Sequence, residues 1–208
     1  MKFVVLAAAA TLLPFAALAE GGASPLPPAP VVVPADSYDW SGGYIGLGIA
    51  RHSGDITPGG FTIAQPLEDV TAPVIFGGYA FQSGSFVYGA EISYSVFEQL
   101  YDDAITFDDR FDNMLDVSLR AGVGFDNLLV YGLAGFSTSE VTNFGPGGER
   151  SADATGLHYG VGVAYGVTDS VAIRLQYVMR NLTFDGGPGN PDVDAEHSTL
   201  TLGAAFRF

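Results

Sequence analysis

Apolar and polar residues alternate along most of the chain with the period of two that is typical of β-strands. Between residues 170 and 182, for example, Ile173 and Leu175 fall on one face, and Arg174 and Gln176 fall on the other. The alternation predicts eight strands, which cover residues 41–51, 72–82, 86–97, 113–125, 128–138, 155–166, 170–182 and 197–208.

The connections between these segments alternate in length. The long ones are 52–71, 98–112, 139–154 and 183–196, and the short ones are 83–85, 126–127 and a turn around Thr168 and Asp169. A soluble sandwich has no reason to alternate in this way, whereas an outer-membrane barrel has short turns on the periplasmic side and long loops outside. We therefore predict an all-β fold, an eight-stranded antiparallel up-and-down transmembrane β-barrel with both ends periplasmic.

A soluble periplasmic β-sandwich is the rival fold, because its strands also alternate. The residues opposite the apolar face favour the barrel. They are mainly Gly, Ala and charged residues, and small side chains allow a narrow barrel of eight strands to close around filled interior space. The apolar set would then face lipid, with an aromatic girdle formed by Trp40, Tyr44, Phe86, Phe125, Phe136 and Phe208.

Five charged residues share the inward phase of the predicted strands: Glu91, Asp116, Arg120, Arg174 and Arg207. An unpaired charge in a narrow lumen is costly, so we predict an ion-pair and hydrogen-bond network that plugs the barrel. Glu91 and Arg120 lie on adjacent strands, as do Arg174 and Arg207. Arg180 shares the inward phase, and we place it near a rim.

Composition narrows the possible functions. The formal net charge of −15 argues against a nucleic-acid partner, which needs a basic surface. The absence of Cys excludes disulfides, thiolate metal sites and Cys nucleophiles. The mean hydropathy is +0.27, yet no uncharged apolar run of helix-spanning length follows the first 20 residues.

The N-terminal region precedes the predicted barrel domain, residues 38–208. Residues 1–19 resemble a secretory signal peptide, with Lys2, an apolar stretch and the cleavage site Ala17-Leu18-Ala19. The alternative is a membrane anchor, which Pro14 disfavours. Residues 20–37 hold five of the twelve prolines, which predicts an extended periplasmic linker.

The two ends of the predicted barrel resemble a known family. The last segment ends in Phe206 and Phe208, in phase with its other apolar residues, and resembles the C-terminal strand that the outer-membrane assembly machinery recognises. Residues 38–48, Tyr-Asp-Trp-Ser-Gly-Gly-Tyr-Ile-Gly-Leu-Gly, resemble the opening strand of the outer membrane protein beta-barrel domain family of alphaproteobacterial surface antigens. That family is similar to the OmpA-type and opacity-type eight-stranded barrels of the porin family.

The resemblance implies a location in the cell outer membrane. The expected partners are outer-membrane lipid, lipopolysaccharide and the assembly machinery, and the family has no shared catalytic residues. A closed barrel has no free strand edge, so we expect a monomer.

Acidic residues gather in two predicted outer loops: Asp102, Asp103, Asp108, Asp109 and Asp112 in one, and Asp185, Asp192, Asp194 and Glu196 in the other. Carboxylates bind divalent cations, but this spacing does not match a Ca²⁺ loop. We interpret both loops as solvated, with cation-bridged contact to lipopolysaccharide as the alternative. No metal ion or cofactor is predicted.

The three histidines were considered as candidates for catalysis. His52 and His197 fall near the outer ends of the first and last strands, where Ser53, Ser198 or Asp55 would complete a hydrolase site like that of a barrel lipase or an omptin-like protease. No G-x-S-x-G motif occurs, so we interpret both as exposed histidines at loop ends, and His158 as part of the lumen network.

Three functions remain. A structural or surface-interaction barrel that supports envelope integrity is favoured by the expected charge pairing in the lumen. A narrow porin-like channel for small solutes is the alternative. A barrel hydrolase is disfavoured, and we predict no catalytic residues.

Overall fold

The computed structural model describes residues 38–57, 64–100, 110–145, 148–184 and 192–208. The described residues belong to one compact unit. The predicted signal peptide and linker lie outside the described residues. So do Asp102, Asp103, Asp108, Asp109 and Asp185 of the acidic loops.

Eight long strands form the barrel: β1 (Gly42–Thr57), β3 (Val70–Ser83), β4 (Phe86–Leu100), β5 (Arg110–Phe125), β6 (Leu128–Gly145), β7 (Gly148–Thr168), β8 (Val171–Phe184) and β9 (Val193–Arg207). A two-residue strand, β2 (Gln65–Pro66), pairs with the end of β1. Within the described residues, no helix is long and apolar enough to span a membrane.

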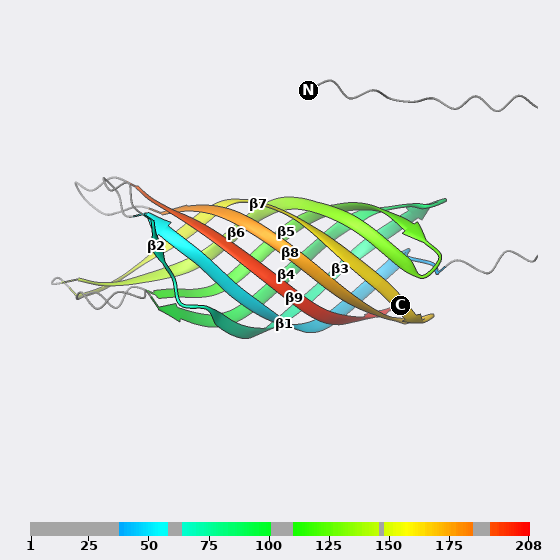
Figure 1. The fold of residues 1–208 in the computed structure, drawn as a ribbon, viewed down its shortest axis with the longest axis horizontal. Coiled ribbons are helices and arrows are strands. Elements are labelled where there is room, and N and C mark those ends of the chain that lie inside the picture. The colour runs from blue at the N-terminus through cyan, green and yellow to red at the C-terminus, as the bar shows by residue number, and fades with distance from the viewer. Residues whose placement is uncertain (1–37, 58–63, 101–109, 146–147, 185–191) are drawn as a thin grey trace, which may run out of the picture. The chain divides into compact units, whose positions relative to one another are not determined.

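The sheet closes on itself. Each long strand pairs antiparallel with the next, and β1 pairs with β9 from Tyr44 opposite Arg207 to Thr57 opposite Asp194 (Figure 1). The backbones of Gly43 and Phe208 complete the seam with hydrogen bonds of 3.2 and 3.0 Å. The predicted eight-stranded antiparallel barrel is therefore confirmed.

The short turns gather at one end of the barrel, which we call the turn end, and the opposite end is the loop end (Figure 1). Gly84 has a φ of 61° and Asp126 a φ of 49°, which are the left-handed conformations that tight hairpins require. The Asn127 side chain adds a 2.9 Å hydrogen bond to the carbonyl of Gly166. Turn chemistry at these positions thus sets the register of the neighbouring strands.

The strands extend further toward the loop end than the sequence analysis predicted. Residues 139–145 and 148–154, which we expected to form a loop, continue the ladder of β6 and β7, with Glu140 opposite Asp153. A strand that has left the membrane needs no apolar outer face, so polar residues continue it. Apolar content therefore marks where the outward face meets lipid and does not mark where a strand ends.

Side-chain polarity inverts along the barrel. Toward the turn end the outward residues form an apolar belt, in which Leu47 is 67% exposed and Leu119 is 72% exposed. Toward the loop end the outward residues are exposed and mostly charged: Arg51, Glu98, Glu140, Asp153, Asn181 and Glu196. The apolar belt meets the requirement of a lipid-facing surface, and the charged zone meets that of water.

The expected aromatic girdle is partly wrong. Phe86, Phe125, Phe136 and Phe208 are outward and at least 60% exposed, whereas Trp40 and Tyr44 are buried. Trp40 precedes β1 at the turn end of the barrel. Its backbone N–H donates a 2.6 Å hydrogen bond to Gln82 Oε1. Tyr44 lies on the inward phase of β1, where its hydroxyl donates a 2.8 Å hydrogen bond to Glu91 Oε2.

Close packing inside the barrel yields a first prediction. A Cβ at Gly46 would collide with the Phe76 ring and the Ala204 carbonyl, whereas a Cβ at Gly132 has only Gly160 O nearby, at 3.8 Å. Gly46→Ala should lower the free energy of unfolding by about 1–3 kcal/mol, as overpacking does. Gly132→Ala, which adds the same methyl group, should leave it unchanged. Urea unfolding followed by gel mobility of unheated samples measures both, and equal effects would contradict the packing argument.

Candidate functional site

The lumen is the candidate site, and its side chains come from the inward phase of the strands. Glu91, Asp116, Arg174 and Arg207 are at most 9% exposed, and the Arg120 side chain is 13% exposed. All five predicted residues therefore point inward. They do not all lie at one level along the axis, because Glu91, Arg120 and Arg174 meet in one layer and Asp116 lies in another.

The first layer surrounds Glu91 of β4. Its Oε2 accepts hydrogen bonds from Arg120 Nη1 at 2.6 Å, Arg174 Nη1 at 2.5 Å and the Tyr44 hydroxyl at 2.8 Å. These partners come from β5, β8 and β1, so the contacts cross the lumen. Arg120 Nη1 also donates to the Tyr44 hydroxyl at 2.6 Å. We call this group the Glu91 layer.

The second layer, which we call the Asp116 layer, is a bidentate ion pair. Arg180 Nε and Nη2 donate to Asp116 Oδ1 and Oδ2 at 3.0 and 2.5 Å. Ser137 donates to Asp116 Oδ1 at 2.6 Å, and Arg180 Nη1 donates to Thr199 Oγ1 at 2.7 Å. The placement of Arg180 near a rim is wrong, because β8 continues to Phe184 and Arg180 is only 3% exposed.

The interpretation of His52 and His197 as exposed loop-end residues is also wrong. They are 1% and 2% exposed, because β1 continues to Thr57 and β9 begins at Val193. The His52 ring stacks on Phe97 with centroids 4.1 Å apart. His197 Nε2 lies 3.2 Å from Gln99 Oε1. Both rings therefore fill the lumen.

His158 has the neighbours of a catalytic histidine. Its Nε2 lies 2.8 Å from Ser118 Oγ, and its Nδ1 lies 2.8 Å from Ser137 Oγ and 3.8 Å from Asp116 Oδ1. A serine hydrolase also needs room for a substrate beside the nucleophile. Ser118 is 6% exposed, and the cavity beside Asp116 has a volume of about 10 Å³. The set can exchange hydrogen bonds, but a substrate does not fit beside it.

A third layer is apolar and was not predicted. Its buried residues lie toward the loop end and are Ile56, Leu67, Ala72, Phe97, Phe111, Met114, Val141, Ala154, Leu182 and Ala195. We call this group the apolar layer. From the sequence we expected mainly Gly, Ala and charged residues on the inward face. The signal was present, since Met114 and Leu182 share the phase of Asp116 and Arg180.

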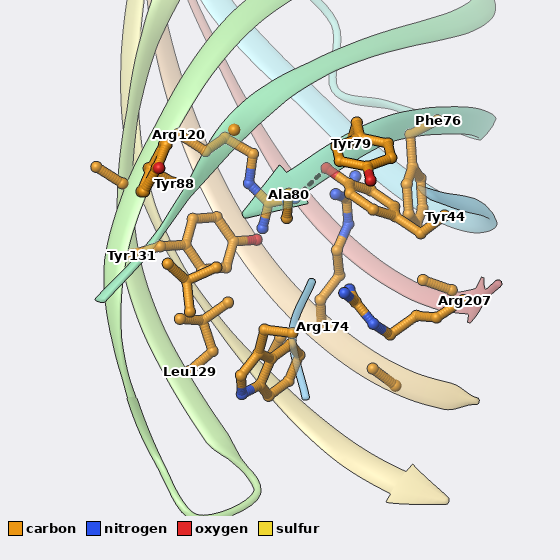
Figure 2. Close-up of a pocket in the computed structure, with 17 residues that line it drawn as sticks. Tyr44, Phe76, Tyr79, Ala80, Tyr88, Arg120, Leu129, Tyr131, Arg174 and Arg207 are labelled. Atoms are coloured by element: carbon orange, nitrogen blue, oxygen red, sulfur yellow. Dashed lines mark hydrogen bonds between the residues drawn. The ribbon is translucent and has the colours of Figure 1, made fainter. Parts of the chain in front are cut away.

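Arg207 departs from the expected ion-pair network. Its Nη2 donates to the Ser41 carbonyl at 2.7 Å, and no carboxylate of the described residues lies within ion-pair distance. Its guanidinium lies 5.7–5.9 Å from the centroids of the Tyr38, Trp40 and Tyr44 rings. Arg207, Arg120 and Arg174 line a cavity of about 40 Å³ near the turn end (Figure 2).

Comparison with known proteins identifies the family of this barrel. Residues 5–208 match the model of the outer membrane protein beta-barrel domain family. The chain belongs to this family. The 25 kDa outer-membrane immunogenic protein of Brucella canis is 33% identical over 220 residues, which cover 99% of each chain. The 22 kDa outer membrane protein of Rhizobium leguminosarum is 28% identical over 184 residues, 84% of this chain and 81% of the relative.

Solved structures agree on the fold of this outer membrane protein beta-barrel domain. Ail of Yersinia pestis superposes with a TM-score of 0.53 at 18% identity, covering 81% of this chain and 99% of Ail. OprG of Pseudomonas aeruginosa superposes with a TM-score of 0.54 at 14% identity, covering 81% and 96%. Family and fold together confirm the predicted location in the outer membrane.

The Asp116 layer yields a second prediction. Asp116→Asn leaves the Arg180 charge buried without a counter-ion and should lower the free energy of unfolding by about 3–5 kcal/mol. The matched control is Asp69→Asn, which breaks a 2.6 Å pair with Arg51 whose side chains are 49% and 65% exposed. The control should cost less than about 1 kcal/mol. Urea unfolding in detergent compares the two, and similar losses would contradict a structural role for the buried pair.

Proposed function

We propose that this protein is a structural, surface-exposed barrel that supports envelope integrity or surface contacts, with a lumen that does not conduct. One observation carries the proposal: the Glu91 layer, the Asp116 layer and the apolar layer follow one another along the lumen. An eight-stranded barrel is narrow enough for side chains to fill it, and these side chains do.

Passage of an ion would require both charged layers to open. Arg174 and Arg180 would have to leave buried carboxylates that they contact at 2.5 Å. Separating such pairs without new partners leaves uncompensated buried charges, which costs several kcal/mol for each pair. The apolar layer adds a segment in which the buried side chains of Phe97, Phe111 and Met114 occupy the lumen. These contacts favour a plug over a narrow porin-like channel.

The loop end suits a surface role. Because β6 and β7 continue to Gly145 and Gly148, the barrel carries its charged outer zone beyond the apolar belt. The Brucella relatives are named immunogenic outer-membrane proteins. We infer that this chain likewise presents its loop end to the outside, beside lipopolysaccharide.

The remaining partner assignments follow from the outer face. The apolar belt would contact membrane lipid, and the closed sheet favours a monomer because it offers no edge strand. Phe206 and Phe208 are 54% and 79% exposed, so an assembly machinery that recognises the last strand would find both rings on the outer face.

Catalysis is not part of the proposal. The histidines, and the serines that contact them, are enclosed by the wall of the barrel, and Asp116 is held by Arg180 in place of orienting a base. A hydrolase site at His52 and His197 is disfavoured for the same reason, since both rings are buried.

Conductance tests the plug. The purified protein in planar bilayers should give no steps above background. Arg120→Ala should lower the free energy of unfolding, because Glu91 loses one of its two arginines, but it should also stay closed, since the Asp116 layer and the apolar layer remain. Stable conductance steps from the unmodified protein would contradict the plug and favour the channel. Steps from Arg120→Ala but not from the unmodified protein would show that the Glu91 layer alone closes the lumen.

A deletion strain tests the role in the envelope. Loss of the protein should raise detergent sensitivity and vesicle release, because a barrel that spans the outer membrane is removed. Complementation with the unmodified gene should restore both. Unchanged detergent sensitivity and vesicle release, together with slower uptake of small solutes, would favour the channel.

A further inference from the structure

Three arginines from different strands reach one cavity near the turn end. Arg120 of β5, Arg174 of β8 and Arg207 of β9 all line it, together with Trp40, Tyr44 and Phe76 (Figure 2). Its volume is about 40 Å³. One water-sized particle needs about 10–15 Å³ by the same measure, so the cavity has room for roughly three.

The charges around this cavity do not balance. Three guanidinium groups face it, and Glu91 is the carboxylate that pairs with two of them. Three positive charges and one negative charge leave a formal excess of +2. The Asp116 layer, by contrast, sets one carboxylate against one guanidinium. Asp39 is exposed to solvent, and its carboxylate accepts hydrogen bonds from the backbone and side chain of Ser41 and forms no ion pair with the three arginines.

Hydrogen-bond donors are also in excess. Trp40 Nε1 and Arg174 Nε are buried and have no partner among the described residues, although both side chains are at most 5% exposed. The Tyr44 and Tyr131 hydroxyls are already committed, to Glu91 and to Gln176 at 2.9 Å. A buried N–H without an acceptor is costly, so the site calls for an acceptor.

Aromatic rings compensate the three charges unequally. The Arg174 guanidinium lies 3.3 Å from the Phe76 centroid, and that of Arg120 lies 3.9 Å from the Tyr131 centroid. The rings nearest Arg207 are 5.7–5.9 Å away, close to the limit of about 6 Å at which a cation–π contact still counts. Arg207 is therefore the least compensated of the three.

We propose that the cavity binds one small anion, of halide to carboxylate size, between Arg174 and Arg207. The charge excess selects a negative ligand, the guanidinium groups of Arg174 and Arg207 supply N–H donors, and the volume excludes nucleotides and sugar phosphates. Bound there, the anion would neutralise part of the excess charge and link β8 and β9 to the segment before β1. The proposal does not rest on the envelope role, because either outcome for that role leaves the cavity as it is.

Trp40 provides the assay, because it is the single tryptophan of the chain. Iodide added at constant ionic strength to the folded protein in detergent should quench its fluorescence along a saturating curve, and chloride should compete. A buried indole without a nearby site is quenched weakly and in proportion to iodide. Linear or absent quenching would overturn the proposal.

Variants locate the site. Arg207→Gln keeps a donor for the Ser41 carbonyl but removes the charge, and it should weaken iodide binding at least tenfold. Arg207→Lys, which keeps the charge, should retain saturation. Arg51→Gln makes the same change of charge on the outer face of β1 and should bind as the unmodified protein does. Equal loss in Arg51→Gln and Arg207→Gln would overturn the proposal, because it would indicate a bulk effect of charge.

If Arg207→Gln does not fold, crystallography of the unmodified protein tests the anion site instead. Crystals of the unmodified protein soaked in bromide should show an anomalous peak within contact distance of the Arg174 and Arg207 guanidinium groups. Absence of that peak at saturating bromide would overturn the proposal.

Discussion

Closure of the sheet between β1 and β9 is the constraint on which the rest of this structure depends. In lipid no water is available to an unpaired backbone N–H or C=O, and each such group costs several kcal/mol. Pairing from Tyr44 to Thr57 against Arg207 to Asp194 removes the two free edges that an open sheet would expose. Closure with eight long strands also sets the radius, so the space that remains inside is just enough for side chains. The filled lumen is thus a consequence of the closed sheet.

The change of solvent along the axis explains which side chains fill that space. Where the outer face is apolar, the interior holds the charged layers around Glu91 and Asp116 together with buried apolar residues such as Phe76. Beyond the apolar belt, the outer face turns polar and apolar residues such as Phe111 and Leu182 gather in the interior, beside the buried His52 and His197. The loop end therefore resembles a small water-soluble barrel that continues a membrane barrel. Its apolar interior supports the extended strands that position the loops.

The two charged layers illustrate different solutions to burying charge. The Asp116 layer is neutral and saturated, since Arg180 meets both carboxylate oxygens and Ser137 and Thr199 add further hydrogen bonds. In the Glu91 layer, Glu91 Oε2 is shared by two guanidinium groups, and Arg207 lies nearby without a carboxylate. The first arrangement suits a permanent plug. The second leaves positive charge available next to a cavity, and this difference separates the part of the lumen that only closes the barrel from the part with binding capacity.

The sequence by itself determined the fold, because a period of two assigns each residue to a face and short turns such as Asp126-Asn127 mark where strands reverse. It therefore placed Glu91, Asp116, Arg120, Arg174 and Arg207 in the lumen. Only the tertiary structure decided which of them meet, since Arg174 and Glu91 lie 83 residues apart and Arg180 and Asp116 lie 64 apart. Alternation gives the face of a residue but not its level along the axis, which depends on the tilt and stagger of the closed strands. For the same reason the burial of His52, His197 and Trp40 could not be predicted: strand ends in water carry no apolar signal, and the segment before β1 folds inward only once a barrel exists to receive it.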